Sequence, residues 1–201
     1  MNTTALVLCD FQRGIVRNDK IAFEDPALPG QTLKAAEALL AAARSAGVPT
    51  VHVGVARPHR RGAYDEIRTA NARKSGRAPR DVLALAQGSS EVEFVIAPVA
   101  GEEIVYKTGV SAFQGTQLDT LLRHAGVRDV VIAGAFTHMV VESTARQGFD
   151  LGYRMHVVRD ACCAPAAAAH NAALSVGIPN FAAIIDSNEA VELIAHGPRA
   201  A

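Results

Sequence analysis

The chain has 201 residues, of which 49% are hydrophobic and 20% are charged. This composition is typical of one globular domain and excludes an intrinsically disordered chain. The 20 lysine and arginine residues balance the 20 aspartate and glutamate residues, so the charge predicts neither nucleic acid nor a membrane surface as the partner. No linker or internal repeat divides the sequence, and we treat residues 1–201 as a single domain.

The cysteines and the N-terminal segment bear on the cellular compartment. Cys162 and Cys163 are adjacent, an arrangement that does not suit a mutual disulfide, and no cysteine–histidine spacing typical of zinc occurs. The N-terminal segment reaches Asp10 without the pattern of a signal peptide, and no apolar run has the length that a bilayer requires. We therefore expect a cytoplasmic protein with buried structural cysteines and with no cofactor.

Strand and helix signals alternate along the first half of the chain. We predict strands over residues 5–9 and 51–55 and, between them, a helix over residues 31–45 that Gly47 ends. Residues 56–90 are rich in arginine and glycine and predict an irregular, basic excursion with a short helix or two. Such an excursion is either a binding loop or a solvated surface loop.

The alternation continues to the end of the chain. We predict strands over residues 103–106, 129–133, 155–158 and 181–185, and helices over residues 116–124, 137–151, 165–176 and 188–195. Alternating strands and helices indicate an α/β fold, a three-layer α/β/α domain with a mainly parallel sheet of roughly six strands and right-handed crossovers.

Polar residues follow three of the predicted strands at their carboxyl ends, where ligands of open α/β sheets bind. Asp10 follows the first strand, Lys107 follows strand 103–106, and Thr137 with His138 follows strand 129–133. An aspartate there can act as a general acid or base, and a lysine can hold it or stabilise an oxyanion. The alternative is an ion pair that only ties strand ends together.

Several segments together resemble the isochorismatase-like hydrolase superfamily, which includes the cysteine amidases related to nicotinamidase. These segments are Leu6 to Gln12, Lys107 to Thr116, Gly134 to Arg146, Asp150 to Tyr153 and Val158 to Ala161. The resemblance covers nearly the whole chain and implies an Asp–Lys–Cys triad, of which Asp10 and Lys107 match the first two members. The cysteine position falls on Val140, which has no nucleophile and cannot form an acyl-enzyme.

The resemblance leaves two functions open. Family members that hydrolyse isochorismate also lack the cysteine; in them the aspartate protonates a vinyl ether, and a histidine often stands where His138 stands. This favours a cysteine-independent hydrolase of a small, carboxylate-bearing molecule, with Asp10 as general acid/base and Lys107 as its electrostatic partner. The segments from Glu142 to Arg146 and from Asp150 to Tyr153 look more like the amidase branch. The alternative is therefore an amidohydrolase relative that has lost its nucleophile and acts by binding or regulation.

The resemblance also implies how the rest of the site is built. Its substrate-binding positions are Phe11, Gln12, Phe113, Phe136, Thr137, His138 and Val140, although Phe113 fits the core equally well. A cis peptide bond is implied between Ala135 and Phe136, and a homo-oligomer, either a dimer or a tetramer, is implied for the assembly. We predict no metal, because the residues that end at His59 do not supply the Asp-x-His set of the amidase branch.

The remaining basic residues have plainer interpretations. His52 and His156 lie in predicted strands and are expected to be structural, and His170 lies on an alanine-rich helix and is expected to be exposed. The basic run of Arg57, His59, Arg60 and Arg61 is either a carboxylate-binding group or a solvated surface.

Overall fold

The computed structural model describes residues 2–57, 63–74 and 85–198. Its centre is a six-stranded sheet with the order β3-β2-β1-β4-β5-β6, in which every neighbouring pair is parallel. The strands are β1 (Thr4–Cys9), β2 (Thr50–Val55), β3 (Glu103–Lys107), β4 (Asp129–Ala135), β5 (Arg154–Cys163) and β6 (Ala182–Ile185). The predicted parallel sheet of about six strands is confirmed.

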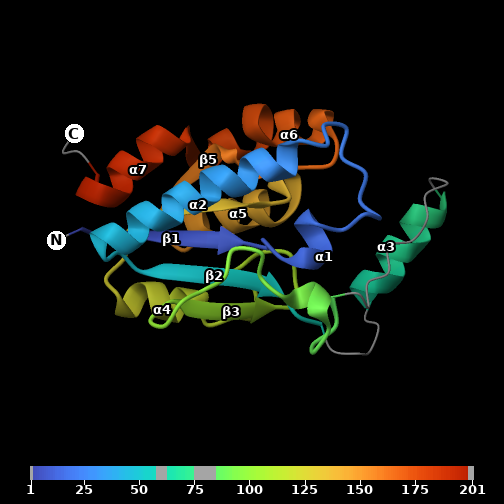
Figure 1. The fold of residues 1–201 in the computed structure, drawn as a ribbon, viewed down its shortest axis with the longest axis horizontal. Helices are drawn as coiled ribbons and strands as arrows, with labels where there is room; N and C mark the ends of the chain where they lie inside the picture. The colour runs from blue at the N-terminus through green and yellow to red at the C-terminus, as the bar shows by residue number, and fades with distance from the viewer. Residues whose placement is uncertain (1, 58–62, 75–84, 199–201) are drawn as a thin grey trace.

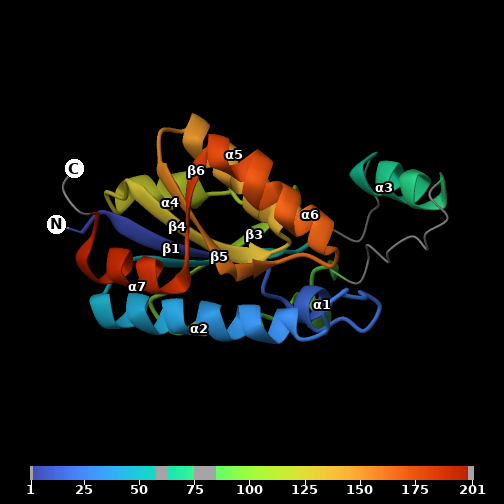
Figure 2. The same ribbon diagram turned by 90° about the horizontal axis from the view of Figure 1, so that it is seen from above.

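Helices cover both faces of this sheet and make the fold three-layered (Figures 1 and 2). The helices are α1 (Arg13–Val16), α2 (Leu28–Ala46), α3 (Ala63–Lys74), α4 (Leu118–His124), α5 (Glu142–Asp150), α6 (Ala167–Ala172) and α7 (Ser187–His196). Leu6 and Leu8 of β1 enter the core under α2 and α7, whereas Ala5 and Val7 enter the core under α4 and α5. This division follows from the alternation of side chains along a strand. No described helix has the length and apolarity to cross a membrane.

Two helices begin at other residues than predicted because of the residues at their N-termini. The first long helix begins at Leu28, ahead of the predicted residue 31, because Pro29 fits the first helical turn. It ends at Gly47, as predicted, in the left-handed conformation with φ of 64°. Residues 116–124 give a helix only from Leu118, whose N–H donates to Thr116 Oγ1 at 3.2 Å.

The region after β4 departs furthest from prediction. Strand β5 runs from Arg154 to Cys163, well beyond the predicted end at Val158, and its pairing with β4 contains an irregularity opposite residues 132–134. The predicted helix 165–176 is wrong in its extent, since α6 stops at Ala172 and a π-helical turn follows. A second π-helical turn, Thr137–Val141, precedes α5 where we predicted one continuous helix.

The basic excursion between β2 and β3 contains α3, so the predicted short helix is confirmed. Figures 1 and 2 show α3 apart from the three layers, beyond the carboxyl ends of the strands. A parallel bridge between Arg57 and Ala86 closes the base of the excursion. The predictions for His59, Arg60 and Arg61 fall outside the described residues.

Candidate active site

The strand order predicts a crevice beyond the carboxyl ends of β1 and β4, where the order of the strands reverses. The chain runs outward from β1 through β2 to β3 on one side, and from β4 through β5 to β6 on the other. Beyond the carboxyl ends of two such adjacent strands lies the usual ligand site of open α/β sheets. Cys9 of β1 pairs with Gly134 of β4, so Asp10 leaves the sheet beside Ala135, the last residue of β4. The π-helical turn Thr137–Val141, called the turn below, begins just beyond this point.

Asp10 and Lys107 form a buried pair at this edge. Lys107 Nζ donates to Asp10 Oδ2 at 2.9 Å and to the carbonyl oxygen of Gly109 at 3.3 Å. Asp10 is 5% exposed and Lys107 is 2% exposed. Asp10 adopts a φ of 61°, and its N–H donates to Val53 O at 2.7 Å. The two residues that we predicted from separate strand ends are thus in direct contact.

The two carboxylate oxygens of Asp10 differ in their hydrogen bonding: Oδ2 accepts from Lys107, and Oδ1 does not. Oδ1 is buried and accepts no hydrogen bond from the described residues. Burial raises the pKa of Asp10 above its ordinary value, and the positive charges of Lys107 and Arg57 only partly oppose this effect. A buried oxygen without a donor is costly, so Oδ1 is the atom at which a proton or a ligand donor completes the site.

Gln12 fixes the segment that carries Asp10. Its Nε2 donates to Val55 O at 3.0 Å and to Val92 O at 2.8 Å, and its Oε1 accepts from Val55 N at 2.7 Å. The side chain is fully buried, and Phe11 beside it lies in the core under α2. We predicted both as substrate-binding residues; the structure shows Gln12 bonded to the backbone of Val55 and Val92, and Phe11 packed in the core.

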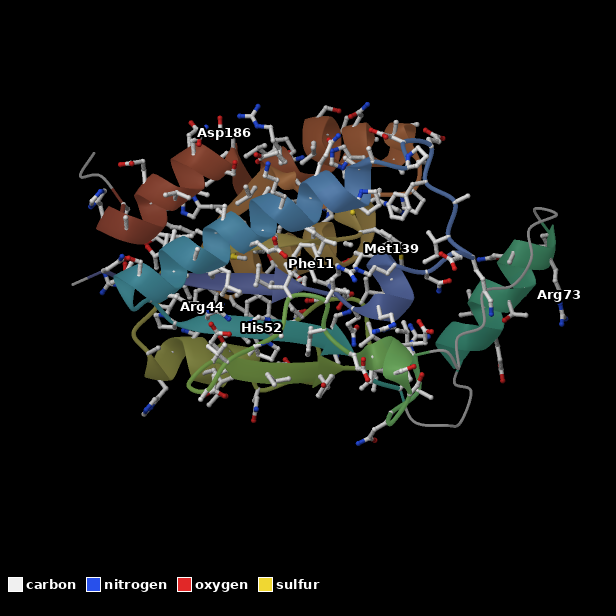
Figure 3. The ribbon with its side chains drawn as sticks, viewed as in Figure 1. Phe11, Arg44, His52, Arg73, Met139 and Asp186 are labelled. Carbon is white, nitrogen blue, oxygen red and sulfur yellow. The ribbon has the colours of Figure 1, made fainter. Side chains whose placement is uncertain are left out.

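The turn supplies the other side of the crevice. The peptide bond between Ala135 and Phe136 is cis, as predicted. The exposed ring of His138 stacks on Phe136, with ring centroids 6.3 Å apart. Val140 is only 1% exposed and belongs to the core under α4 and α5. Figure 3 shows Phe11, which follows β1, and Met139 of the turn near the centre of the molecule.

Three more residues with sequence predictions are Phe113, His170 and Arg57. The ring of Phe113 stacks on Tyr153 at 5.8 Å, which favours the core alternative. His170 is not exposed: it is half-buried, and its Nδ1 lies 2.8 Å from Thr137 Oγ1. The sequence prediction ends β5 too early, at Val158. Because α6 follows the true end of β5, it starts near the carboxyl ends of the strands, where the candidate site lies. Arg57 reaches Asp10 electrostatically from the end of β2.

His52 and His156 each contact a carboxylate, and the three cysteines are buried. His52 Nε2 lies 2.8 Å from Glu102 Oε2, and His156 Nε2 lies 3.1 Å from Asp129 Oδ1. All three cysteines are free and buried, and burial raises the pKa of each thiol. No group of three metal-ligating side chains occurs within the part of the chain that the structure describes.

Comparison with known proteins decides the family. The model of the Isochorismatase domain matches residues 4–189. The chain belongs to the isochorismatase family. The isochorismatase family protein YecD of Escherichia coli O157:H7 is 28% identical over 185 residues, which cover 90% of this chain and 91% of the relative. YwoC of Bacillus subtilis, from the same family, is 31% identical over 95% of this chain and 94% of its own.

Two similar proteins have names that state an activity. The ureidoacrylate amidohydrolase RutB of Caulobacter vibrioides is 40% identical, but only over 45% of this chain and 42% of its own length. The N-carbamoylsarcosine amidase of Thermoplasma acidophilum is 25% identical and superposes with a TM-score of 0.69 over 92% of this chain and 97% of its own. An isochorismatase family protein of Burkholderia thailandensis, 26% identical, gives a TM-score of 0.74 over 96% and 95% of the two chains. The chain is thus a member of a family of hydrolases.

Proposed function

We propose that this chain hydrolyses a small, carboxylate-bearing molecule with Asp10 as general acid and base, and without a covalent enzyme intermediate. The observation that carries this proposal is that the two carboxylate oxygens of Asp10 have different surroundings. Oδ2 is bound to Lys107, whereas Oδ1 is buried and without a donor among the described residues. Together with the raised pKa, this favours a carboxylate that is paired with Lys107 and can take up a proton on Oδ1 to give to a substrate.

The reaction that suits these groups best is hydrolysis of a vinyl ether. The Asp10 carboxylic acid gives its proton to the terminal carbon of the double bond, and the electron pair of that bond forms the new C–H bond. Water then adds to the resulting oxocarbenium carbon and returns a proton to Asp10. The hemiketal so formed breaks into a ketone and an alcohol. The charge of Lys107 stabilises the Asp10 carboxylate while the proton is on the substrate.

Val140 supports a mechanism that needs no thiol. It occupies the position that the family resemblance assigns to the nucleophilic cysteine, and its buried side chain has no reactive atom. Cys9, Cys162 and Cys163 are buried with raised thiol pKa values, which keeps them as unreactive thiols. An acyl-enzyme of the usual cysteine kind therefore has no candidate residue at this edge of the sheet.

A second candidate function is non-catalytic binding by a relative of the amidohydrolases. The names of the ureidoacrylate amidohydrolase and the N-carbamoylsarcosine amidase favour it, in combination with the apolar Val140. Such a protein would hold a small amide at the same crevice and release it unchanged.

A substrate panel separates the two functions. Purified protein is incubated with isochorismate, simpler enolpyruvyl ethers and a set of small amides in ¹⁸O-labelled water, and products are read by mass spectrometry. We expect labelled ketone from an enol ether, and a loss of about 10²- to 10⁴-fold in Asp10→Asn. The exposed Asp19→Asn serves as the control and should match the wild type.

The outcomes are distinct. Turnover that survives Asp10→Asn would overturn the acid–base proposal. Tight binding of an amide without any product would favour the second candidate, and amide hydrolysis gained in Val140→Cys would show descent from an amidase. A homo-oligomer, dimer or tetramer, stays a prediction from the family resemblance, and a cytoplasmic location stays a prediction from the sequence. Light scattering of the purified protein tests the first of them.

A further inference from the structure

Helix α6 is bound to a surface loop that also contacts the site. Glu24 Oε2 accepts from Ala167 N at 2.8 Å, and Glu24 N donates to Pro165 O at 2.9 Å. The neighbouring Phe23 packs edge-on against Phe136, with ring centroids 5.9 Å apart. The loop therefore holds both α6 and the residue that precedes the turn.

The carboxyl half of α6 contacts the turn through one hydrogen bond. His170 Nδ1 and Thr137 Oγ1 lie 2.8 Å apart. Thr137 is fully buried, so its hydroxyl needs a partner within the protein. Burial and the neighbouring His138 lower the pKa of His170, which favours the neutral imidazole. In the tautomer with a proton on Nε2, Nδ1 accepts the hydrogen bond from the threonine hydroxyl.

The turn needs such a contact more than an ordinary helical start does. A π-helical turn is rarer than an α-helical one and is held by its surroundings, and such turns occur often at functional sites. This turn starts just after the end of β4, which lies beside the end of β1, so a rotation of the turn would move its residues relative to Asp10. Thr137 is the first residue of the turn, and its hydroxyl is the point at which α6 restrains it.

We propose that His170 is a positioning residue for the reaction assigned to Asp10. By binding Thr137 Oγ1, it fixes the turn Thr137–Val141 against the crevice without contacting the substrate. The proposal rests on the proposed function for its effect on turnover, but its structural part is independent of that function. Loss of the bond should impair the chemical step more than substrate binding.

The test uses two pairs of variants of the full chain. His170→Ala and Thr137→Val remove the bond, whereas His170→Asn and Thr137→Ser keep a group that can form it. We expect kcat to fall about fivefold in the first pair, the factor that corresponds to one ordinary hydrogen bond, with KM changed less than about twofold. The conservative pair should keep most of the wild-type kcat, and the exposed His124→Ala is the control.

Amide hydrogen exchange gives a readout that does not need a substrate. Residues 137–141 should exchange about fivefold faster in His170→Ala than in the wild type, and His170→Asn should restore protection. The double variant His170→Ala with Thr137→Val should exchange no faster than either single variant, because both remove the same bond.

Each result has one meaning. Unchanged exchange over residues 137–141 in His170→Ala overturns the positioning role, whatever the activity. A change in KM alone, or a His170→Asn variant as impaired as His170→Ala, also overturns it. Should His170→Ala fail to fold, the comparison of Thr137→Ser with Thr137→Val decides in the same way. If no probe is turned over by the wild type, the proposed function fails while the exchange measurement still decides the role of His170.

Discussion

Replacement of Lys107 by methionine tests whether Lys107 and Asp10 form an ion pair. Lys107 Nζ lies 2.9 Å from Asp10 Oδ2, and both side chains are nearly inaccessible to water. The replacement keeps most of the apolar stem of the side chain and removes only the charge. Among the residues that the structure describes, Asp10 then has no cation at contact distance, and such broken buried pairs cost about 3–5 kcal/mol. Because Arg57 still acts on Asp10, we expect the free energy of unfolding to fall by about 3 kcal/mol at neutral pH.

The pH dependence of this loss identifies its cause. Without Lys107, the pKa of Asp10 in the folded protein rises further above its unfolded value, so the folded state binds a proton that the unfolded state does not. Stability of Lys107→Met should therefore be largest at low pH and decrease as the pH rises through the folded pKa of Asp10. Urea unfolding at several pH values between about 5 and 8 measures this slope.

Two further variants complete the test. Adding Asp10→Asn to Lys107→Met should recover at least half of the loss and remove the added pH dependence, because no unpaired charge stays buried. Lys34→Met, on the exposed face of α2, should stay within about 0.5 kcal/mol of the wild type. A loss below about 1 kcal/mol that is the same at every pH would refute the buried ion pair.

Three other predictions concern stability and can be measured by urea unfolding. Gly134→Ala should lose about 2 kcal/mol or more, because its Cβ would lie 2.6 Å from the carbonyl oxygen of Cys9; Gly30→Ala, with nothing within 4 Å, should be neutral or stabilising. Gln12→Ala should lose about 3 kcal/mol, because it leaves buried backbone groups without partners, and equal stability would show that these bonds are replaced by water. The pKa of Glu102 is lowered to about 2 by hydrogen bonds from Arg44, Val99 N and His52, against the effect of burial. The stabilisation that the Glu102 carboxylate gives is therefore lost as the pH falls from about 4.5 toward 2. Glu102→Gln should make the free energy of unfolding less dependent on pH in this range, and an unchanged dependence would contradict the prediction.

The fold could be predicted because its strands carry local signals. Buried parallel strands read as short apolar runs, and β1, β2 and β4 were found within one or two residues of their true ends. The prediction ends β5 too early because Arg159 and Asp160 interrupt its apolar pattern, although the strand resumes its pairing with β4, in a shifted register, at Cys162 and Cys163. A polar pair inside a strand has no local signature that separates it from a loop.

The candidate site was predictable only in part, for a related reason. Asp10 and Lys107 were recognised because each follows a strand of its own, and topology brings strand ends together. Two other features of the site depend on contacts between segments that are distant in the sequence. They are the hydrogen bond from Val55 N to Gln12 Oε1 and the one between Thr137 Oγ1 and His170 Nδ1. Such contacts follow from the packing of α6 and of the residues before β3, which the sequence pattern does not determine.

The position of β1 between β2 and β4 has a consequence for the order in which the site can form. Asp10 and Lys107 belong to the N-terminal three strands, whereas the turn belongs to the C-terminal three. These halves meet along the β1–β4 ladder and where α2 packs on α7. During synthesis, the emerging chain can bring Asp10 and Lys107 together before β4 exists, but contacts between distant segments form slowly. A half-made chain therefore exposes one side of β1, and the crevice is completed only when β4 docks there.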